Sequence, residues 1–396
     1  MPSGNHSDLM ILSALHPYPP QAGGTRHMLD SIAQLSRFYA IDLCILQDPA
    51  VPLVWGPLTD WCRSCHAFER TPRRLSPWLP PAVSLEYSAP LCQHVQQAWA
   101  IRSPRMVQIE YTSMLQYAPL ARRTGATVIC TAYVIAFVAQ VRRAQRETDH
   151  RRRARRWLGA MALWWYELRM LPLCDLVMTL SAYDAIVLRR WLPRLPVFAA
   201  GAGMNLDDHP VCFNPQAQHE VLFVGSYQHP PNVEGALWLA QEVWPLVQQA
   251  CPDARLTLAG KSPPAALQAL ASEHVRVPGT LDDVRPCYER ASLFAAPIFW
   301  GSGVRIKILE ALAYGMPLVT TPMAAEGINL VDQKHALFAQ QPGEFAAAIV
   351  QLLQDAPLRE RLSRAGRALI EQQHNWQRLG EQLIARYEQA HAGRLR

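Results

Sequence analysis

Short apolar runs alternate with longer amphipathic segments along this chain, and the alternation restarts once. In the first half the apolar runs are rich in β-branched residues, which suits parallel strands that are covered on both faces. These runs lie at residues 9–15, 40–46, 106–111, 127–132 and 176–181. Strands that alternate with helices are typical of βαβ units and of an open parallel sheet.

A segment rich in glycine, proline and polar residues, 199–220, interrupts this pattern, which then returns. The later apolar runs lie at residues 221–226, 255–260, 292–297 and 317–322, and helices are expected at 233–249 and 306–314. A chain of 396 residues exceeds what one core usually fills, so two domains are expected. We therefore predict an α/β protein with two Rossmann-like, doubly wound halves and a ligand cleft between them.

The stretch "GSGVRIKILEALAYGMPLVTTP" at 301–322 carries the most chemistry. Gly301 and Gly303 allow the backbone to turn at the end of a strand and to lie close to a ligand. Arg305 and Lys307 are expected in the first turn of the next helix, where free N–H groups and the helix dipole attract an anion. Cations oppose that dipole at a cost of ~0.3–1 kcal/mol each, and an anionic ligand would reverse this cost.

Glu310 lies one turn after Lys307, where its carboxylate would accept hydrogen bonds from a ribose diol. In the alternative interpretation, Glu310 pairs with Lys307 and the glycines only form a turn. We favour a nucleotide-sugar site because the glycines, the cations, the acid and the helix ends all agree with it.

Two further loops follow predicted strands and are candidates for contact with a diphosphate. Gly23 and Gly24 come after the first strand and precede a helix, so their amides would face the cleft. Gly225 and Ser226 end the strand at 221–224, and Asn232 is expected to cap the helix that follows. An ordinary glycine turn explains the first loop as well, and a capped strand-to-helix connection explains the second.

These segments resemble the family 4 glycosyltransferases of the GT-B fold. "GSGVRIKILEALAYGMPLVTTPMAAEGI" is similar to the donor-binding signature of the branch that reads G-x-G-x-R-x-K-x-L-E-A. "VLFVGSYQHPPNVEGALWL", "VRVPGTLDDVRPCYERASLFAAP", "HPYPPQAGG" and "YELRMLPLCDLVMTLSAYDA" resemble the same branch in order and spacing. The resemblance implies a retaining hexosyltransferase that takes a sugar from a nucleotide-diphosphate donor, with no metal and no other cofactor.

The resemblance also implies roles for individual residues. Glu310 would hold the donor ribose, Arg305 and Lys307 the diphosphate, and Gly24 would lie against the diphosphate from the N-terminal domain. Many relatives have an acidic residue that contacts the donor sugar where this chain has Ser302. Many also have a His-Asp or His-Asn pair near the reacting sugar where this chain has Tyr133 and Val134. We therefore expect Arg305, Lys307 and Tyr133 to act in catalysis. The expected donor-binding residues are Gly23, Gly24, Gly225, Ser226, Gly301, Ser302, Gly303, Arg305, Lys307 and Glu310.

The predicted domains follow from the same resemblance. They are an N-terminal Rossmann-like acceptor-side domain at 1–198, a linker at 199–217, a nucleotide-sugar-binding domain at 218–372, and a C-terminal helix at 373–396 that crosses back to the first domain.

A basic segment from Arg142 to Trp165 contains eight arginines between Arg142 and Arg156, followed by three tryptophans. A cationic helix flanked by tryptophan is typical of a patch on an anionic membrane surface. The alternative is a solvated helix whose tryptophans belong to the core. Nucleic acid is not an expected partner, because no recognition fold accompanies the charge.

We expect a glycosyltransferase that moves a sugar from a UDP- or GDP-sugar to a saccharide or lipid-linked acceptor, in cell-surface polysaccharide or glycoconjugate synthesis. The alternative function is a catalytically weakened nucleotide-sugar-binding protein on the same fold. Cys62, Cys65 and His66 spell a haem-attachment pattern, which we interpret as a chance match. The odd number of cysteines, nine, and the lack of an export signal favour a cytoplasmic protein. The basic segment would add a peripheral position on the inner membrane face.

Overall fold

The computed structural model describes residues 7–20, 22–49, 52–72, 79–102, 104–214, 219–281 and 283–395. The chain forms two compact units. One consists of Met1–Ala202 together with Trp376–Arg396, and the other consists of Gly203–Asn375. The predicted domain boundaries at 198, 217 and 372 stay predictions.

The first unit is built on a seven-stranded sheet in the order β3-β2-β1-β4-β5-β6-β7. Every neighbouring pair in this sheet is parallel. Its strands are β1 (Ser7–Ser13), β2 (Tyr39–Gln47), β3 (Ser64–Glu69), β4 (Met106–Glu110), β5 (Thr127–Ala132), β6 (Leu176–Thr179) and β7 (Val197–Ala199). The helices of this unit are α1 (Gly23–Leu35), α2 (Leu58–Trp61), α3 (Pro81–Leu85), α4 (Ala89–Arg102), α5 (Ala118–Arg122), α6 (Ala136–Arg146), α7 (His150–Met170), α8 (Ala182–Trp191) and α16 (Trp376–His391), with 3₁₀ turns at Thr112–Tyr117 and Leu171–Leu173.

The second unit is built on a six-stranded parallel sheet in the order β10-β9-β8-β11-β12-β13. Its strands are β8 (Glu220–Val224), β9 (Arg255–Ala259), β10 (Val275–Arg276), β11 (Leu293–Ala296), β12 (Leu318–Thr320) and β13 (Leu337–Phe338). Its helices are α9 (Pro230–Trp238), a π-helical turn at Leu239–Val243, α10 (Trp244–Ala250), α11 (Ala265–Gln268), α12 (Arg285–Arg290), α13 (Ile306–Ala313), α14 (Pro342–Gln354) and α15 (Ala356–Gln373).

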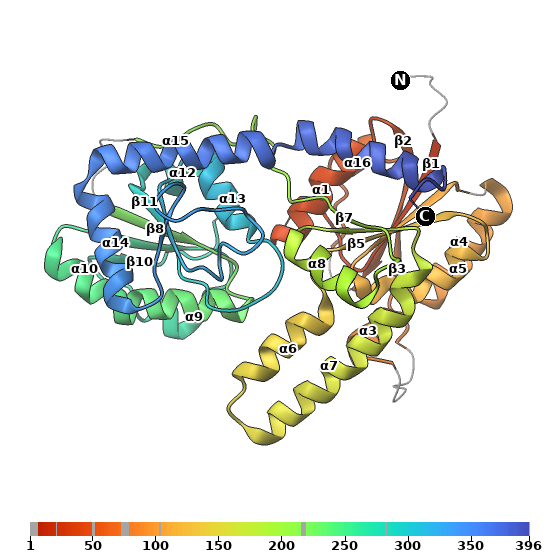
Figure 1. Ribbon diagram of the computed structural model, residues 1–396, viewed down its shortest axis with the longest axis horizontal. Helices are drawn as coiled ribbons and strands as arrows, with labels where there is room; N and C mark the ends of the chain where they lie inside the picture. Colours follow the sequence, from red (N-terminus) through yellow and green to blue (C-terminus); the bar gives the residue numbers. More distant parts are fainter. Residues whose placement is uncertain are drawn as a thin grey trace. The chain divides into compact units, whose positions relative to one another are not determined.

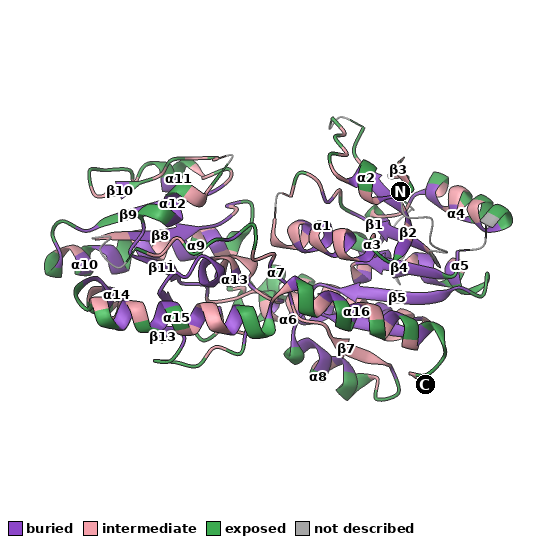
Figure 2. Ribbon diagram, turned by 90° about the horizontal axis from the view of Figure 1, so that it is seen from above, coloured by how far each residue is buried: buried purple, intermediate pink, exposed green. Residues whose placement is uncertain are grey.

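The two sheets therefore follow the same pattern of strand order. In each sheet the first three strands run in chain order from the centre to one edge, and the later strands run from the centre to the other edge. Most strands are buried, whereas the helices around them combine buried and exposed residues (Figure 2). All six residues of β5 are buried, as expected for a strand covered on both faces. This architecture confirms the predicted α/β class with two doubly wound sheets.

Helices α6 and α7 form an antiparallel hairpin that extends away from the sheet of the first unit (Figure 1). The basic segment found in the sequence occupies this hairpin. The side chains of Trp157 and Trp165 on α7 are 37% and 51% exposed, so these two tryptophans are not core residues. Trp164 is half-buried and packs edge-on against Trp191 of α8.

Helix α16 belongs to the first unit. Its residues Trp376, Leu383 and Tyr387 are buried. The Tyr387 hydroxyl donates to Oε1 of Gln108 on β4 at 2.7 Å. This contact ties the end of the chain to the middle of the first sheet.

Candidate donor-binding site

The strand order of each sheet reverses at one place, between β1 and β4 in the first and between β8 and β11 in the second. In open parallel sheets, ligands bind beyond the carboxyl ends of the strands at such a switch point. The loops that follow β8 and β11 contain Gly225, Ser226 and the Gly301–Gly303 segment. The predicted donor residues of the second unit therefore lie where this topology favours a ligand.

The backbone conformation of the loop between β11 and α13 depends on its glycines. Gly301 has a φ of 132° and Gly303 a φ of 77°, values that other residues rarely adopt. The Arg305 guanidinium folds back over this loop, and its Nη1 donates to the Gly303 carbonyl. Arg305 is only 8% exposed. It is the N-cap residue of α13 rather than part of its first turn, because its φ and ψ of −85° and 89° are not helical.

Lys307 lies in the first turn of α13 and points towards the end of β8. Its Nζ donates to Oδ1 of Asn232 at 2.6 Å and lies 4.5 Å from the centre of the Phe223 ring. A Cβ added to Gly225 would come 2.6 Å from this Nζ, so a larger residue there would displace the ammonium group. Burial, followed by the nearby Arg305 charge, lowers the pKa of Lys307 to about 7.

Asn232 does not cap α9, which corrects the expectation from the sequence. The helix begins at Pro230 with His229 as its N-cap, and Asn232 lies inside the first turn. Proline at the first position of a helix needs no backbone donor, so the helix starts earlier than the polar residue indicates. The Asn232 side chain instead joins Lys307 to the backbone carbonyl of Ser226, which accepts from Nδ2 at 2.6 Å.

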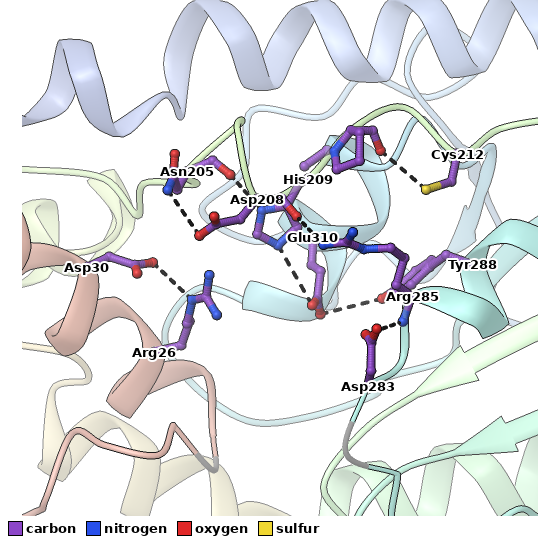
Figure 3. A network of polar contacts seen from close by, with 12 residues as sticks. Arg26, Asp30, Asn205, Asp208, His209, Cys212, Asp283, Arg285, Tyr288 and Glu310 are labelled. Carbon is purple, nitrogen blue, oxygen red and sulfur yellow. Dashed lines mark hydrogen bonds and ion pairs between the residues drawn. The ribbon is translucent and has the colours of Figure 1, made fainter. Parts of the chain in front are cut away.

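Glu310 of α13 is half-buried and lies between His209 and Tyr288 (Figure 3). The Tyr288 hydroxyl lies 3.5 Å from Oε2 of Glu310, and Nε2 of His209 lies 3.9 Å from Oε1. Nδ1 of His209 is 2.7 Å from the Asn205 carbonyl oxygen, which can only accept a hydrogen bond. Nε2 therefore carries a proton towards Glu310 only when the imidazole is charged.

The alternative interpretation, an ion pair between Lys307 and Glu310, is not found. Among the described residues, the hydrogen bond of Lys307 goes to Asn232 and no carboxylate forms an ion pair with it. Two hydroxyl groups beside this arrangement, those of Ser226 and Ser302, are shielded from solvent without a hydrogen-bond partner in the described part of the chain. A buried hydroxyl without a partner is costly unless a ligand or water supplies one.

The candidate residues of the first unit lie at the other switch point. Gly23 and Gly24 begin α1, and a Cβ on Gly24 would come 2.7 Å from the Tyr111 hydroxyl. Close approach of Tyr111 is thus enough to explain a glycine at position 24. Tyr133 follows β5, is 5% exposed, and stacks on the Tyr111 ring at 4.4 Å. Burial raises the pKa of Tyr133 well above its ordinary value.

Two more groups at this switch point were not singled out from the sequence. Glu110 ends β4 and is fully buried, and burial raises the pKa of its carboxyl to about 7. His27 of α1 packs edge-on against Tyr133 and beside Trp376 of α16. Burial lowers the pKa of His27 to about 4, so its imidazole is neutral at pH 7. The catalytic role of Tyr133 stays a prediction.

Sequence reasoning missed three features of the candidate site in the second unit. These are His209, Tyr288 and the contacts of Asn232. His209 lies in the irregular segment before β8, and no spacing in the sequence connects it with Glu310. Among the described residues, no three His, Cys, Asp or Glu side chains are placed to hold a metal ion. Metal-independent chemistry stays a prediction as well.

The fold is shared with solved glycosyltransferase structures. Sucrose-phosphate synthase from Thermosynechococcus elongatus aligns with a TM-score of 0.76 at 18% identity, over 97% of this chain and 99% of that protein. HepE of Anabaena, solved with UDP and glucose, aligns with a TM-score of 0.70 at 14% identity, over 97% of this chain and 100% of that protein. Together with these alignments, the two parallel sheets, each with one reversal of strand order, define a protein of the GT-B fold.

Sequence comparison matches part of the chain to a known family. Residues 218–355 match the family described as glycosyl transferases group 1. A protein in the cps region of Klebsiella pneumoniae is 27% identical over 172 residues, which are 40% of this chain and 42% of that protein. Phosphatidyl-myo-inositol mannosyltransferase of Mycobacterium leprae is 29% identical over 181 residues, 44% of this chain and 47% of the enzyme. The matches thus span under half the length of these two relatives. Residues 218–355, about a third of the chain, thus match the group 1 glycosyltransferases, also called family 4.

Proposed function

We propose that this chain transfers a sugar from a nucleotide-diphosphate donor to a saccharide or lipid-linked acceptor and retains the anomeric configuration. The proposal depends on the position of Arg305, Lys307 and Glu310. All three lie at the start of α13 or within it, at the switch point of the second sheet. The donor would be a UDP- or GDP-sugar. The HepE structure, which contains UDP and glucose, supports a nucleotide-sugar donor.

The proposed chemistry depends on the leaving group. Glycosyl transfer passes through a state with oxocarbenium character, so negative charge grows on the departing phosphate. Arg305 and Lys307 would hold the diphosphate, and the first N–H groups of α13 would add hydrogen-bond donors. Cations that are already in place stabilise the growing charge without reorganising. Gly225, Ser226, Gly301, Ser302 and Gly303 would line the same part of the site, and Gly23 and Gly24 are proposed as further donor-binding residues.

The roles of Glu310 and Lys307 can be separated with two ligands. If Glu310 holds the ribose, Glu310→Gln should weaken UDP or GDP binding about ten- to a hundredfold, because a hydrogen bond to a charged group is lost. The same variant should bind inorganic pyrophosphate like the wild type. Lys307→Met should weaken both ligands. Calorimetric titration measures the affinities, and an equal loss of pyrophosphate binding in Glu310→Gln would contradict the ribose assignment.

The alternative function, a binding protein with little turnover, has an observation in its favour. Tyr133 stands where the resemblance expects an imidazole, and its hydroxyl is buried. Slow hydrolysis of a UDP- or GDP-sugar, followed as release of nucleotide, separates the two functions. A protein that binds the donor and releases no nucleotide, with or without saccharide acceptors, would be the binding protein.

We further propose that α7 docks on an anionic membrane surface, so that the protein is cytoplasmic and peripheral on the inner membrane face. The exposed apolar residues Trp157, Leu158, Met161 and Trp165 follow helical spacing and share one face of α7. The exposed Arg151 and Arg153 border this face one to two turns earlier. No helix in the described part of the chain is both long and apolar enough to cross a bilayer.

A lipid-linked acceptor would make such docking useful, and two relatives support this context. One is named a phosphatidyl-myo-inositol mannosyltransferase, and another is encoded in the cps region of Klebsiella pneumoniae. They support a role in cell-surface polysaccharide or glycoconjugate synthesis. Nucleic acid is not part of the proposal.

Flotation with liposomes tests the docking surface. An arginine near anionic lipid contributes ~1 kcal/mol, so Arg151→Gln with Arg153→Gln should lower binding to phosphatidylserine vesicles about tenfold or more. Trp157→Ser with Trp165→Ser should also lower it, through lost apolar insertion. Arg364→Gln, which replaces an exposed arginine of the second unit, is the matched control. Equal flotation of all variants, or none of the wild type, would leave α7 as a solvated helix.

A further inference from the structure

Lys307 is half-buried, and the surroundings of its amine differ from those of a lysine in an ion pair. Its hydrogen-bond partner is the neutral side-chain oxygen of Asn232 on α9, at 2.6 Å. The other groups against it are the Phe223 ring of β8 and the backbone of Gly225. The charged groups that act on the amine are Arg305, of the same sign, and Glu310, whose carboxylate faces His209 and Tyr288. A cation that is largely removed from water is usually paired with an anion, and this one is held by an amide.

The orientation of the Asn232 amide follows from its second contact. Nδ2 lies 2.6 Å from the Ser226 carbonyl oxygen, which can only accept a hydrogen bond. The NH₂ group must therefore face Ser226, and the amide oxygen must face Lys307. This arrangement fixes the amine beside the Gly225–Ser226 loop without neutralising its charge.

We propose that Asn232 and Lys307 form a proton-coupled clamp, in which the amine takes up a proton from solvent as a nucleotide diphosphate binds. The proposal rests on the proposed function, since it concerns the same diphosphate. Asn232 acts as a positioning residue, because it holds the amine in place while leaving its proton affinity low. The diphosphate then supplies the missing negative charge, and the bound amine is an ammonium ion.

The lowered pKa of Lys307 agrees with this arrangement of its neighbours. Burial and Arg305 place the pKa of the free amine at about 7, and an anion in contact would raise it towards the ordinary range. Binding should then take up about 0.1 proton at pH 6, about 0.5 at pH 7 and about 0.9 at pH 8. The affinity for the nucleotide should fall about fivefold between pH 7 and pH 8, and about tenfold for each pH unit above that.

Calorimetric titration of UDP and GDP at pH 8, in buffers of different ionisation enthalpy, counts the protons directly. At this pH the terminal phosphate of the nucleotide, whose pKa is about 6, is already ionised and adds little. We expect an uptake of about 0.9 proton by the wild type. In Asn232→Asp a carboxylate faces the amine and keeps it charged, so the uptake should fall below about 0.2 proton.

Two further variants keep the test decisive. Asn329→Asp adds the same charge to the second unit at an exposed position, where Nδ2 contacts Gln373, and should keep the full uptake. Lys307→Arg keeps a cation at all pH values and should bind without uptake, even if Asn232→Asp does not fold. Binding by the wild type without proton uptake at pH 8, or unchanged uptake in a folded Asn232→Asp protein, would overturn the clamp alone. If neither UDP nor GDP bound, the proposed function would fail with it.

Discussion

Lys307→Met should lower kcat for sugar transfer about 10²- to 10³-fold, the largest loss of activity that we expect from one substitution. This is the usual effect of removing one fixed group that stabilises the charge of a transition state. Methionine has a similar length and no charge, so Asn232 and Phe223 would keep a side chain between them. Release of nucleotide from the donor, with and without acceptor, measures the loss.

The chain provides a matched control for this substitution. Lysine occurs at only three positions, and Lys334 is an exposed one in the second unit. Lys334→Met removes the same charge away from the switch point and should leave kcat unchanged. If both variants kept wild-type turnover while binding the donor, Lys307 would have no part in stabilising the leaving group.

Gly260→Ala should cause the largest loss of stability. Gly260 follows β9 with a φ of 146°, and an added Cβ would lie 1.8 Å from the Gly225 carbonyl oxygen. The neighbouring atom belongs to the backbone and cannot rotate away, so the loop after β8 must move. We expect the free energy of unfolding of the second unit to fall by about 3 kcal/mol or more. Because Gly225 also adjoins Lys307, nucleotide binding should weaken in whatever protein stays folded.

Gly279→Ala separates the clash from the backbone strain. Gly279 has a φ of 81°, and a Cβ there would meet no atom within 4 Å. This variant should therefore lose only the ~1–2 kcal/mol that an unfavourable φ costs. Thermal unfolding of the two variants measures the difference. Equal losses would mean that the contact between the loops after β8 and β9 contributes nothing to stability.

The central strands were predictable because burial on both faces leaves a continuous apolar run. The predicted strand at 127–132 matches β5 residue by residue, and all its side chains are buried. The strands β3, β7, β10 and β13 were missed. They are short or lie at an edge of a sheet, and β3 reads "SCHAFE" with every residue at least partly exposed. An edge strand does not need the apolar pattern by which a central strand is recognised.

The residues of the candidate site could be singled out only where they are close in sequence. Gly301, Arg305, Lys307 and Glu310 belong to one loop and one helix, so their spacing indicated an anion site. The contact between Asn232 and Lys307 and the position of His209 beside Glu310 arise from the topology of the sheet. A local pattern cannot report them, and at Asn232 the local pattern indicated a cap that the structure does not have.

The first unit is assembled from two stretches of chain that the whole second unit separates. Gln108 and Tyr39 of the first stretch form hydrogen bonds with Tyr387 and Glu388 of the last helix. During synthesis, these two partners emerge from the ribosome only after the second unit is complete. The first unit therefore stays incomplete until α16 is synthesised, and the surface of α1 that α16 contacts is uncovered until then. A protease or a premature stop codon acting near residue 375 would leave the first unit unfinished and the second unit intact.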